Sequence, residues 1–136
     1  MMSPDQFAEL TRQATSAADN AYAPYSRFYV GAAILLDSGQ IVIGCNVENA
    51  SYRLTNCAEQ TAIARAVAQF GPTIRVHAVV IANRNGAACQ PCGACRQTIS
   101  EFAPPEAMIV FPGPNGVPTT ATLAALFPGA FALSAQ

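Results

Sequence analysis

The chain has 136 residues, of which 51% are apolar and 11% are charged, and its formal net charge is −1. This length fits one domain with a modest core and is too short for two. Seven basic residues against eight acidic ones leave little material for the basic face that nucleic-acid phosphates require. The low charged fraction indicates a compact protein that also buries surface in an oligomer.

The N-terminus and the cysteines indicate where the chain works. The opening residues MMSPDQFAEL carry an acid at position 5 and no apolar stretch, so we expect no signal peptide. Since no apolar run in the sequence approaches the length of a membrane span, we expect no membrane partner. The five cysteines are odd in number and closely spaced. They therefore predict a reducing, cytoplasmic location, with the thiols bound to metal or free.

The apolar pattern predicts helices and strands in alternation. A first helix begins at Ser3 and Pro4, because serine suits the N-cap and proline the first helical position. The turn Asp37–Gly39 joins two strands as a hairpin. After the first helix, the predicted elements are strands at 28–36 and 40–47, a helix at 58–70, a strand at 74–82, a helix at 94–102, a strand at 107–111 and a short helix at 122–127. This order predicts one mixed sheet with helices on its faces, in a single domain over residues 1–136.

The segment CQPCGAC, residues 89–95, places three of the five cysteines at equal spacing. An iron–sulfur cluster would need another cysteine close behind, but Cys95 is followed by Arg-Gln-Thr. A closed structural zinc site would take four sulfurs, those of Cys57, Cys89, Cys92 and Cys95. A catalytic zinc site would take three and leave one position for water.

The residues around Cys57 favour the catalytic site. Cys57-Ala58-Glu59 begins one predicted helix, and PCGAC begins another. Two helix N-termini would then converge on one metal, where their dipoles and free N–H groups stabilise thiolates. A carboxylate two residues after a cysteine ligand, followed by P-C-x-x-C, is the signature of zinc deaminases. A structural zinc site has no need of Glu59.

The sequence resembles the small, homotetrameric, zinc-dependent cytidine deaminases over nearly its whole length. The matching segments are YAPYSRF at 22–28, VGAA at 30–33, GCNVENASY at 44–52, CAE at 57–59, PCGACRQ at 91–97 and PGAF at 128–131. The resemblance implies a three-layer α-β-α domain with a mixed sheet of about five strands and one Zn²⁺ per subunit. It also implies a homotetramer in which neighbouring subunits complete each active site.

The resemblance implies hydrolytic deamination of cytidine and 2′-deoxycytidine to uridine and 2′-deoxyuridine, with release of ammonia, in pyrimidine salvage. Zinc on Cys57, Cys92 and Cys95 would supply the hydroxide that attacks C4. Glu59 would pass the proton to N3 and then to the departing ammonia, which requires a carboxyl pKa raised by burial.

The resemblance also implies the substrate contacts. The Ala58 N–H would hold the base carbonyl, and Phe28 would pack against the pyrimidine. Asn46 and Glu48 would bind the ribose hydroxyls. The aromatic side chains of Tyr52 and Phe131 would reach the active site of a neighbouring subunit.

Local patterns leave other interpretations open for several of these residues. Phe28 at a strand start fits a core residue, and Phe131 fits ordinary packing. Asn46 and Glu48 alternate along a predicted strand and fit a solvated face. His77, the single histidine, lies inside an apolar strand and fits a structural role. Cys45 fits a small buried apolar residue.

Two positions depart from the motif of the family. Gln60 follows Glu59 where three-cysteine members commonly carry an arginine that hydrogen-bonds to the zinc thiolates. We predict that Arg96, Arg53 or the helix termini offset the thiolate charge; alternatively, the site is less Lewis acidic and the enzyme slower. Cys89 has no counterpart in the motif, and we predict that it is not a ligand.

Three other functions compete with this interpretation. The same chemistry could act on a modified cytidine or on a nucleoside antibiotic of the blasticidin type, although the segment 46–49 favours plain ribose. A polynucleotide-editing deaminase would need a basic groove, which the near-neutral charge argues against. A non-enzymatic zinc module would have no use for Glu59.

Overall fold

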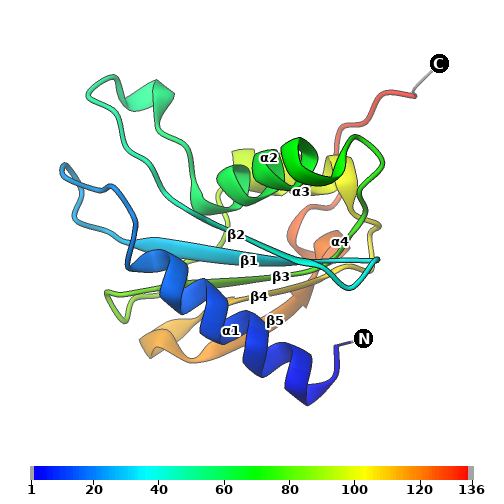
Figure 1. The fold of residues 1–136 in the computed structure, drawn as a ribbon, viewed down its shortest axis with the longest axis horizontal. Helices are drawn as coiled ribbons and strands as arrows, with labels where there is room; N and C mark the ends of the chain where they lie inside the picture. Colours follow the sequence, from blue (N-terminus) through cyan, green and yellow to red (C-terminus); the bar gives the residue numbers. More distant parts are fainter. Residues whose placement is uncertain (1, 135–136) are drawn as a thin grey trace.

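The computed structural model describes residues 2–134, which form one mixed sheet with helices on both faces (Figure 1). In chain order the elements are α1 (Pro4–Ala18), β1 (Val30–Leu36), β2 (Ile41–Cys45), the 3₁₀ helix η1 (Tyr52–Leu54), α2 (Ala58–Phe70), β3 (Val76–Asn83), α3 (Gly93–Phe102), β4 (Met108–Pro112), the 3₁₀ helix η2 (Pro114–Gly116), β5 (Pro118–Thr122) and α4 (Leu123–Leu126). The five strands lie in the order β2-β1-β3-β4-β5. β3 and β4 are parallel and the other pairs antiparallel. The predicted three-layer α-β-α fold is confirmed.

Helix α1 covers one face of the sheet, and α2, α3 and α4 cover the other. Strand β1 is buried along its whole length, because successive side chains point to opposite faces and both faces are covered. Ala32 and Ile34 join the core beneath α2, whereas Ala33 and Leu35 join the core beneath α1. Within residues 2–134, every helix is too short or too polar to cross a membrane.

Two glycines let a helix from each side lie directly on the hairpin. A Cβ atom on Gly44 of β2 would overlap the Ala62 nitrogen and the Ala58 oxygen of α2. A Cβ atom on Gly31 of β1 would overlap the Ala14 oxygen of α1. The glycine at 44 therefore sets how closely the first turns of α2, which follow Cys57, approach the sheet.

The candidate site residues come mostly from one edge of the sheet. Val30 pairs with Asn83 and Gly31 with Cys45, so β1 begins where β2 and β3 end. Strand β4 runs parallel to β3 and ends at the same edge. The loops at 19–29, 46–57 and 84–92 leave from here, and the second of these extends away from the body of the protein (Figure 1).

The sequence pattern does not predict strand β5, and it places several strand ends differently, including the start of β3, which is Val76 rather than residue 74. The preceding residues Pro112 to Gly116 are typical of a loop, and Pro118 lacks a donor for pairing. Threonines at alternating exposure nevertheless form this edge strand. β1 begins at Val30 rather than Phe28, and β2 ends at Cys45 rather than at residue 47. Asn46 and Glu48 therefore lie in the loop beyond β2, not on a strand.

Candidate active site

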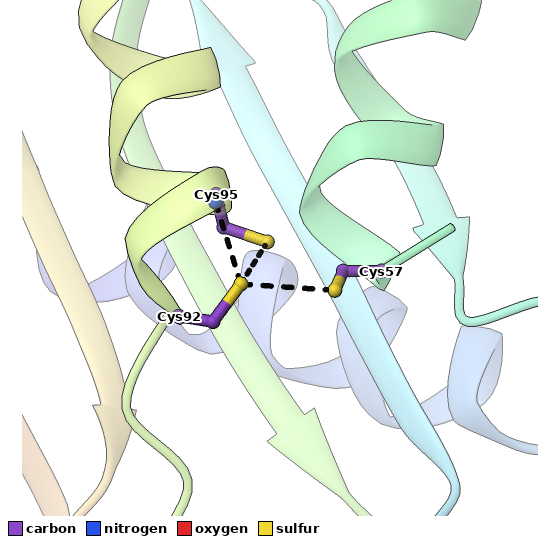
Figure 2. Close-up of side chains that lie close together, drawn as sticks. All are labelled: Cys57, Cys92 and Cys95. Carbon is purple, nitrogen blue, oxygen red and sulfur yellow. Dashed lines mark hydrogen bonds between the residues drawn. The ribbon is translucent and has the colours of Figure 1, made fainter. Parts of the chain in front are cut away.

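Three sulfur atoms from two helices converge on one point. The Sγ atoms of Cys57, Cys92 and Cys95 all lie within 4.8 Å of one another (Figure 2). Cys57 Sγ is 3.8 Å from Cys92 Sγ, which is 3.4 Å from Cys95 Sγ. Cys92 is exposed and Cys95 is fully buried. The cluster thus sits at the boundary between core and solvent, where small molecules can reach it.

Helix N-termini position all three sulfurs. Cys57 is the N-cap of α2 and Cys92 is the N-cap of α3, both with extended backbone, and Cys95 lies in the first turn of α3. The Cys95 N–H donates to Cys92 Sγ at 3.4 Å. The positive ends of two helix dipoles thus face the cluster and favour anionic sulfur. The predicted convergence of two helix starts is confirmed.

The contacts within the cluster separate the thiols. The neighbouring Cys95 thiol lowers the Cys57 pKa to about 7, against the opposing effects of burial and of Glu59. The proximity of Cys57, together with burial, raises the pKa of Cys95. Cys57 is therefore the more readily ionised of these two thiols.

Glu59 lies in the first turn of α2, two residues after the N-cap Cys57. Its side chain is buried, with 4% of the residue exposed. Burial raises its carboxyl pKa, because the ionised form loses hydration. A buried carboxyl with a raised pKa beside the three cysteine sulfurs can serve as both acceptor and donor of a proton.

Cys89 lies outside the sulfur cluster. Among the described residues, the group of candidate metal ligands contains Cys57, Cys92 and Cys95 alone. Cys89 packs against the core beneath α2, and its N–H donates to the Pro112 oxygen at 2.8 Å. Burial raises its thiol pKa to about 11. Cys89 is thus a neutral, half-buried thiol, in agreement with the prediction that it is not a ligand.

A cavity of about 390 Å³ opens between two of the edge loops. Its lining residues are Tyr25, Ser26, Glu48, Tyr52 and Thr55. The Glu48 carboxylate accepts hydrogen bonds from the Tyr25 N–H at 2.9 Å, from the Ser26 N–H at 3.1 Å and from the Ser26 hydroxyl. These bonds, the Ser26 hydroxyl first, lower the Glu48 pKa. The cavity therefore presents an ionised carboxylate, which can accept hydrogen bonds from hydroxyl groups.

Asn46 is buried beside this cavity rather than displayed on a face. Its Oδ1 accepts from the Val30 N–H at 2.9 Å, and its Nδ2 donates to the Phe28 oxygen at 2.8 Å. An amide has a second Nδ2 hydrogen and a second Oδ1 lone pair. The Asn46 side chain therefore fixes the backbone that leads into β1. The second Nδ2 hydrogen and the second Oδ1 lone pair remain for the predicted contact with ribose.

The aromatic residues predicted to bind substrate have different surroundings. Phe28 is half-buried and packs against the same core cluster as Ala58 and Cys89. Tyr52 in η1 is 77% exposed and contacts the Tyr25 ring edge-to-face, with centroids 6.2 Å apart. Phe131 is 66% exposed and does not line the cavity beside Glu48. Its backbone oxygen accepts a hydrogen bond from the side chain of Gln97 in α3. The two exposed rings are free to contact another molecule.

Comparison with known proteins identifies the family. The sequence model of the cytidine and deoxycytidylate deaminase zinc-binding region matches residues 4–111. The chain belongs to this deaminase family. It is 42% identical over 122 residues to a cytidine deaminase of Halalkalibacterium halodurans, covering 90% of this chain and 91% of that protein.

Solved cytidine deaminase structures share the whole fold. The enzyme from Mycobacterium tuberculosis matches with a TM-score of 0.81 and 42% identity, over 93% of this chain and 98% of that one. The enzyme from Burkholderia pseudomallei matches with a TM-score of 0.83 and 39% identity, over 96% and 100%. These similarities extend well beyond the cysteine motifs.

The cysteine cluster fits the zinc that the family binds. Zinc–sulfur bonds of about 2.3 Å in a tetrahedral site place sulfurs about 3.8 Å apart. The Cys57–Cys92 separation of 3.8 Å equals that spacing, and the Cys92–Cys95 separation of 3.4 Å is slightly shorter. Three thiolates form a donor set that zinc prefers. Cys57, Cys92 and Cys95 would hold the ion, and three protein ligands leave one of four positions for water, as in catalytic deaminase sites.

The side chains of Gln60 and Arg96 support the deaminase site without hydrogen-bonding to its sulfurs. Gln60 Oε1 accepts from the Cys57 N–H at 3.4 Å, as a cap on α2. The Arg96 guanidinium donates to the oxygens of Pro91 and Leu126 and to Gln90 Oε1, at 2.7, 2.6 and 2.9 Å. No arginine in residues 2–134 hydrogen-bonds to a sulfur. Arg96 therefore links the loop that carries Cys92 to α4. That Arg96 offsets the charge of the thiolates stays a prediction.

The sequence does not indicate two residues that position the loops around the cavity, Ser26 and Asn85. Ser26 holds Glu48 through both its backbone and its hydroxyl. Asn85 hydrogen-bonds to the backbone of Arg27 and Tyr29, far away in the sequence. The pair Asn85-Gly86 has the signal of a turn, and nothing in that signal indicates a partner in another loop.

Proposed function

We propose that this protein hydrolyses the 4-amino group of cytidine and 2′-deoxycytidine, giving uridine or 2′-deoxyuridine and ammonia. One observation carries the proposal: among residues 2–134, three cysteine sulfurs and no fourth converge at two helix N-termini, with the buried Glu59 in the first turn of one of these helices. A structural zinc site would be closed by four ligands and would not bury a carboxyl beside them. The relatives named cytidine deaminase support the substrate class.

Glu59 moves the protons of the reaction. Zinc, when bound by the three thiolates, supplies Lewis-acid activation of water. The Glu59 carboxylate accepts one proton from the attacking water and passes it to N3 of the pyrimidine. It then accepts the second water proton from the hydroxyl group formed on C4 and delivers it to the 4-amino nitrogen as the C4–N bond breaks and C4=O forms. The C4–O bond formed from water remains in the product, and ammonia carries the departing nitrogen. The raised carboxyl pKa suits this two-way transfer.

The cavity side binds the nucleoside. Glu48, held ionised by Ser26, accepts hydrogen bonds from ribose hydroxyls, and the remaining Asn46 valences face the same sugar. The Ala58 N–H at the start of α2 holds the base carbonyl, and Phe28 packs on the pyrimidine. All of these contacts bind substrate and transition state alike, so they set KM more than kcat.

Assembly and location complete the proposal. The exposed rings of Tyr52 and Phe131 support a homotetramer in which each subunit contributes an aromatic side chain to a neighbour's site. All five cysteines are free thiols, which supports a reducing, cytoplasmic location and a role in pyrimidine salvage.

Ammonia release from a panel of nucleosides tests the proposal directly. The panel contains cytidine, 2′-deoxycytidine, 5-substituted cytidines and a cytosine-nucleoside antibiotic. We expect cytidine and 2′-deoxycytidine to have the highest kcat/KM. Activity on the antibiotic alone would replace the proposal with a resistance enzyme of the same chemistry, and no activity on any member would end it.

Glu59→Gln identifies the proton carrier in the same assay. Glutamine keeps the shape of the side chain but cannot transfer the proton, so we expect kcat to fall by about 10²–10⁴-fold. Zinc content and thermal stability should match the wild type, because Glu59 is not a ligand. A variant that retains kcat would assign the proton transfer to another group.

A further inference from the structure

Every backbone hydrogen-bonding group of residues 27–30, the segment that leads into β1, is satisfied, and two asparagine side chains satisfy half of these groups. Asn46 bonds to the Phe28 oxygen and the Val30 N–H. Asn85 bonds to the Arg27 oxygen at 3.0 Å and the Tyr29 N–H at 3.1 Å. The two amides therefore bond to alternate residues of this segment: Asn85 to residues 27 and 29, and Asn46 to residues 28 and 30.

The other groups of this segment are bonded to backbone or to Ser26. The Arg27 N–H donates to Ala23, the Phe28 N–H to the Ser26 hydroxyl at 3.0 Å, and the Tyr29 oxygen accepts from the Arg84 N–H. Arg27 has a φ of 57°, a left-handed conformation that costs a non-glycine residue of the order of 1 kcal/mol. Such a conformation persists only where surrounding bonds hold it, and Asn85 holds its carbonyl.

This segment directly follows one wall of the candidate nucleoside site, which Tyr25 and Ser26 form. Both of these residues hydrogen-bond to Glu48. Phe28 packs beneath α2, on the same face as the cysteine cluster. A shift of the segment would therefore move the pyrimidine contact and the partners of Glu48 together.

Asn85 comes from the loop that leads to the metal ligands. Asn83 Oδ1 accepts from the Asn85 and Ala87 N–H groups at 2.9 and 3.2 Å, and its Nδ2 donates to the Ala87 oxygen at 2.8 Å. This ordered turn at 83–87 precedes CQPCGAC directly. The turn presents Asn85 to this segment from the same loop that ends in Cys92.

We propose that Asn85 is a positioning residue for substrate binding, which acts by fixing the backbone of Arg27 to Tyr29 and, through it, Phe28 and the partners of Glu48. The proposal rests on the function proposed above, since it assigns the wall to nucleoside binding. It makes substrate affinity depend on an exposed side chain in another loop.

Steady-state kinetics on cytidine test the role with three variants. Asn85→Ala removes both bonds, and we expect KM to rise about 3–10-fold with kcat within about twofold, because the wall contacts ground state and transition state equally. Asn85→Asp keeps the acceptor for the Tyr29 N–H and loses the donor for the Arg27 oxygen, so its KM should lie between. Asn20→Ala removes an exposed amide that makes no side-chain hydrogen bond within residues 2–134, and it should match the wild type.

Hydrogen exchange at the Tyr29 amide tests the hydrogen bond between Tyr29 and Asn85 without measuring catalysis. We expect faster exchange in Asn85→Ala than in the wild type or Asn20→Ala, with an unchanged zinc content. Unchanged exchange, an unchanged KM, or a fall in kcat at constant KM would overturn the assignment. A wild type that does not deaminate cytidine would instead overturn the proposed function, and the exchange result would still decide whether Asn85 fixes the segment.

Discussion

Glu59 and the three clustered sulfurs lie at the first turns of two packed helices, whereas Glu48, Tyr52 and Phe131 lie in loops or the C-terminal segment. Glu59 is 4% exposed, but Tyr52 is 77% exposed and Phe131 66%. The metal side is thus fixed by helix starts pressed onto a buried sheet. The nucleoside side is fixed by side-chain hydrogen bonds between loops.

The difference separates two tasks of the site. Bond-making chemistry needs groups held to within a fraction of an ångström, which packed helices provide. Substrate must enter and product must leave, and loops at a sheet edge leave that path open. One chain therefore contains all of the proposed chemical groups, while Tyr52 and Phe131 are exposed on its surface.

Removing one sulfur should break the metal side completely. Cys95→Ala deletes a buried ligand, so we expect zinc to fall from one per chain to near zero and deamination to fall to background, because metal affinity should drop by more than about 100-fold. Cys89→Ala is the matched control, a cysteine from the same loop that lies outside the cluster. It should keep full zinc and full kcat. Metal analysis and the deamination assay measure both.

A loss of zinc in Cys89→Ala would show that a fourth sulfur closes the site. No position would then remain for water, and the catalytic interpretation of the cluster would fail. This outcome would favour a structural metal site and would remove the distinction between the two sides.

Mixed oligomers should show whether the nucleoside side is shared between chains. Glu59→Gln lacks the proton carrier and Phe131→Ala lacks an exposed ring, so each homo-oligomer should be weakly active, with Phe131→Ala reduced about tenfold. In equal mixtures, a site that takes Glu59 from one chain and Phe131 from the other is complete. About a quarter of the sites should then be restored in a symmetric assembly.

Activity no higher than the average of the two parents would show that Phe131 acts in its own chain or not at all. Size-exclusion chromatography with light scattering must accompany the assay, since the mixture informs only if chains exchange. Tyr52→Ala in place of Phe131→Ala extends the same test to η1.

The sequence predicts the metal side well because its signals are local. Cys57 is the N-cap of α2 and Cys92 is the N-cap of α3, and both follow from short motifs at predicted helix starts. Cys89 could be set aside because it stands outside the P-C-x-x-C spacing. Helix periodicity and capping act within a few residues, so a single sequence contains their evidence.

The nucleoside side was less predictable because its contacts join distant segments. The sequence pattern places Asn46 on the solvated face of a strand, yet it lies beyond β2, is buried and hydrogen-bonds to the backbone of Phe28 and Val30. Arg96 stands next to a ligand, yet its guanidinium reaches the carbonyl of Leu126. Asn85 reads as a turn residue, and strand β5 follows a loop-like run. Such pairings depend on the fold as a whole.

Two glycine variants should separate support of the metal side from general stability. Gly44→Ala would push the Ala58 and Ala62 backbone of α2 away from β2, and Gly31→Ala would push α1 from the other face. Both should lower the free energy of unfolding by about 1–3 kcal/mol, as overpacking does. Only Gly44→Ala should also lower kcat, because α2 carries Cys57 and Glu59. Equal kcat losses in both would show that α2 has no special role.

The smallest effect concerns the charge of Glu48. The Ser26 hydroxyl is the largest cause that lowers the Glu48 pKa below its ordinary value of 4.5. Since the folded pKa lies below the unfolded one, the ionised carboxylate stabilises its loop above the unfolded pKa and loses this effect as pH falls through the folded pKa. Ser26→Ala should move the Glu48 pKa back toward 4.5, so the stabilisation becomes smaller and its loss on acidification is complete at a higher pH.

Carbon-13 NMR titration of the Glu48 carboxyl measures this shift, with Ser38→Ala as the control, because Ser38 bonds to Gln40 in a distant turn. An unmoved Glu48 pKa in Ser26→Ala would mean that the two backbone N–H groups hold the charge alone. The wall at 25–26 would then fix the carboxylate through its backbone, and the affinity for hydroxyl groups would depend on the position of that backbone rather than on the Ser26 side chain.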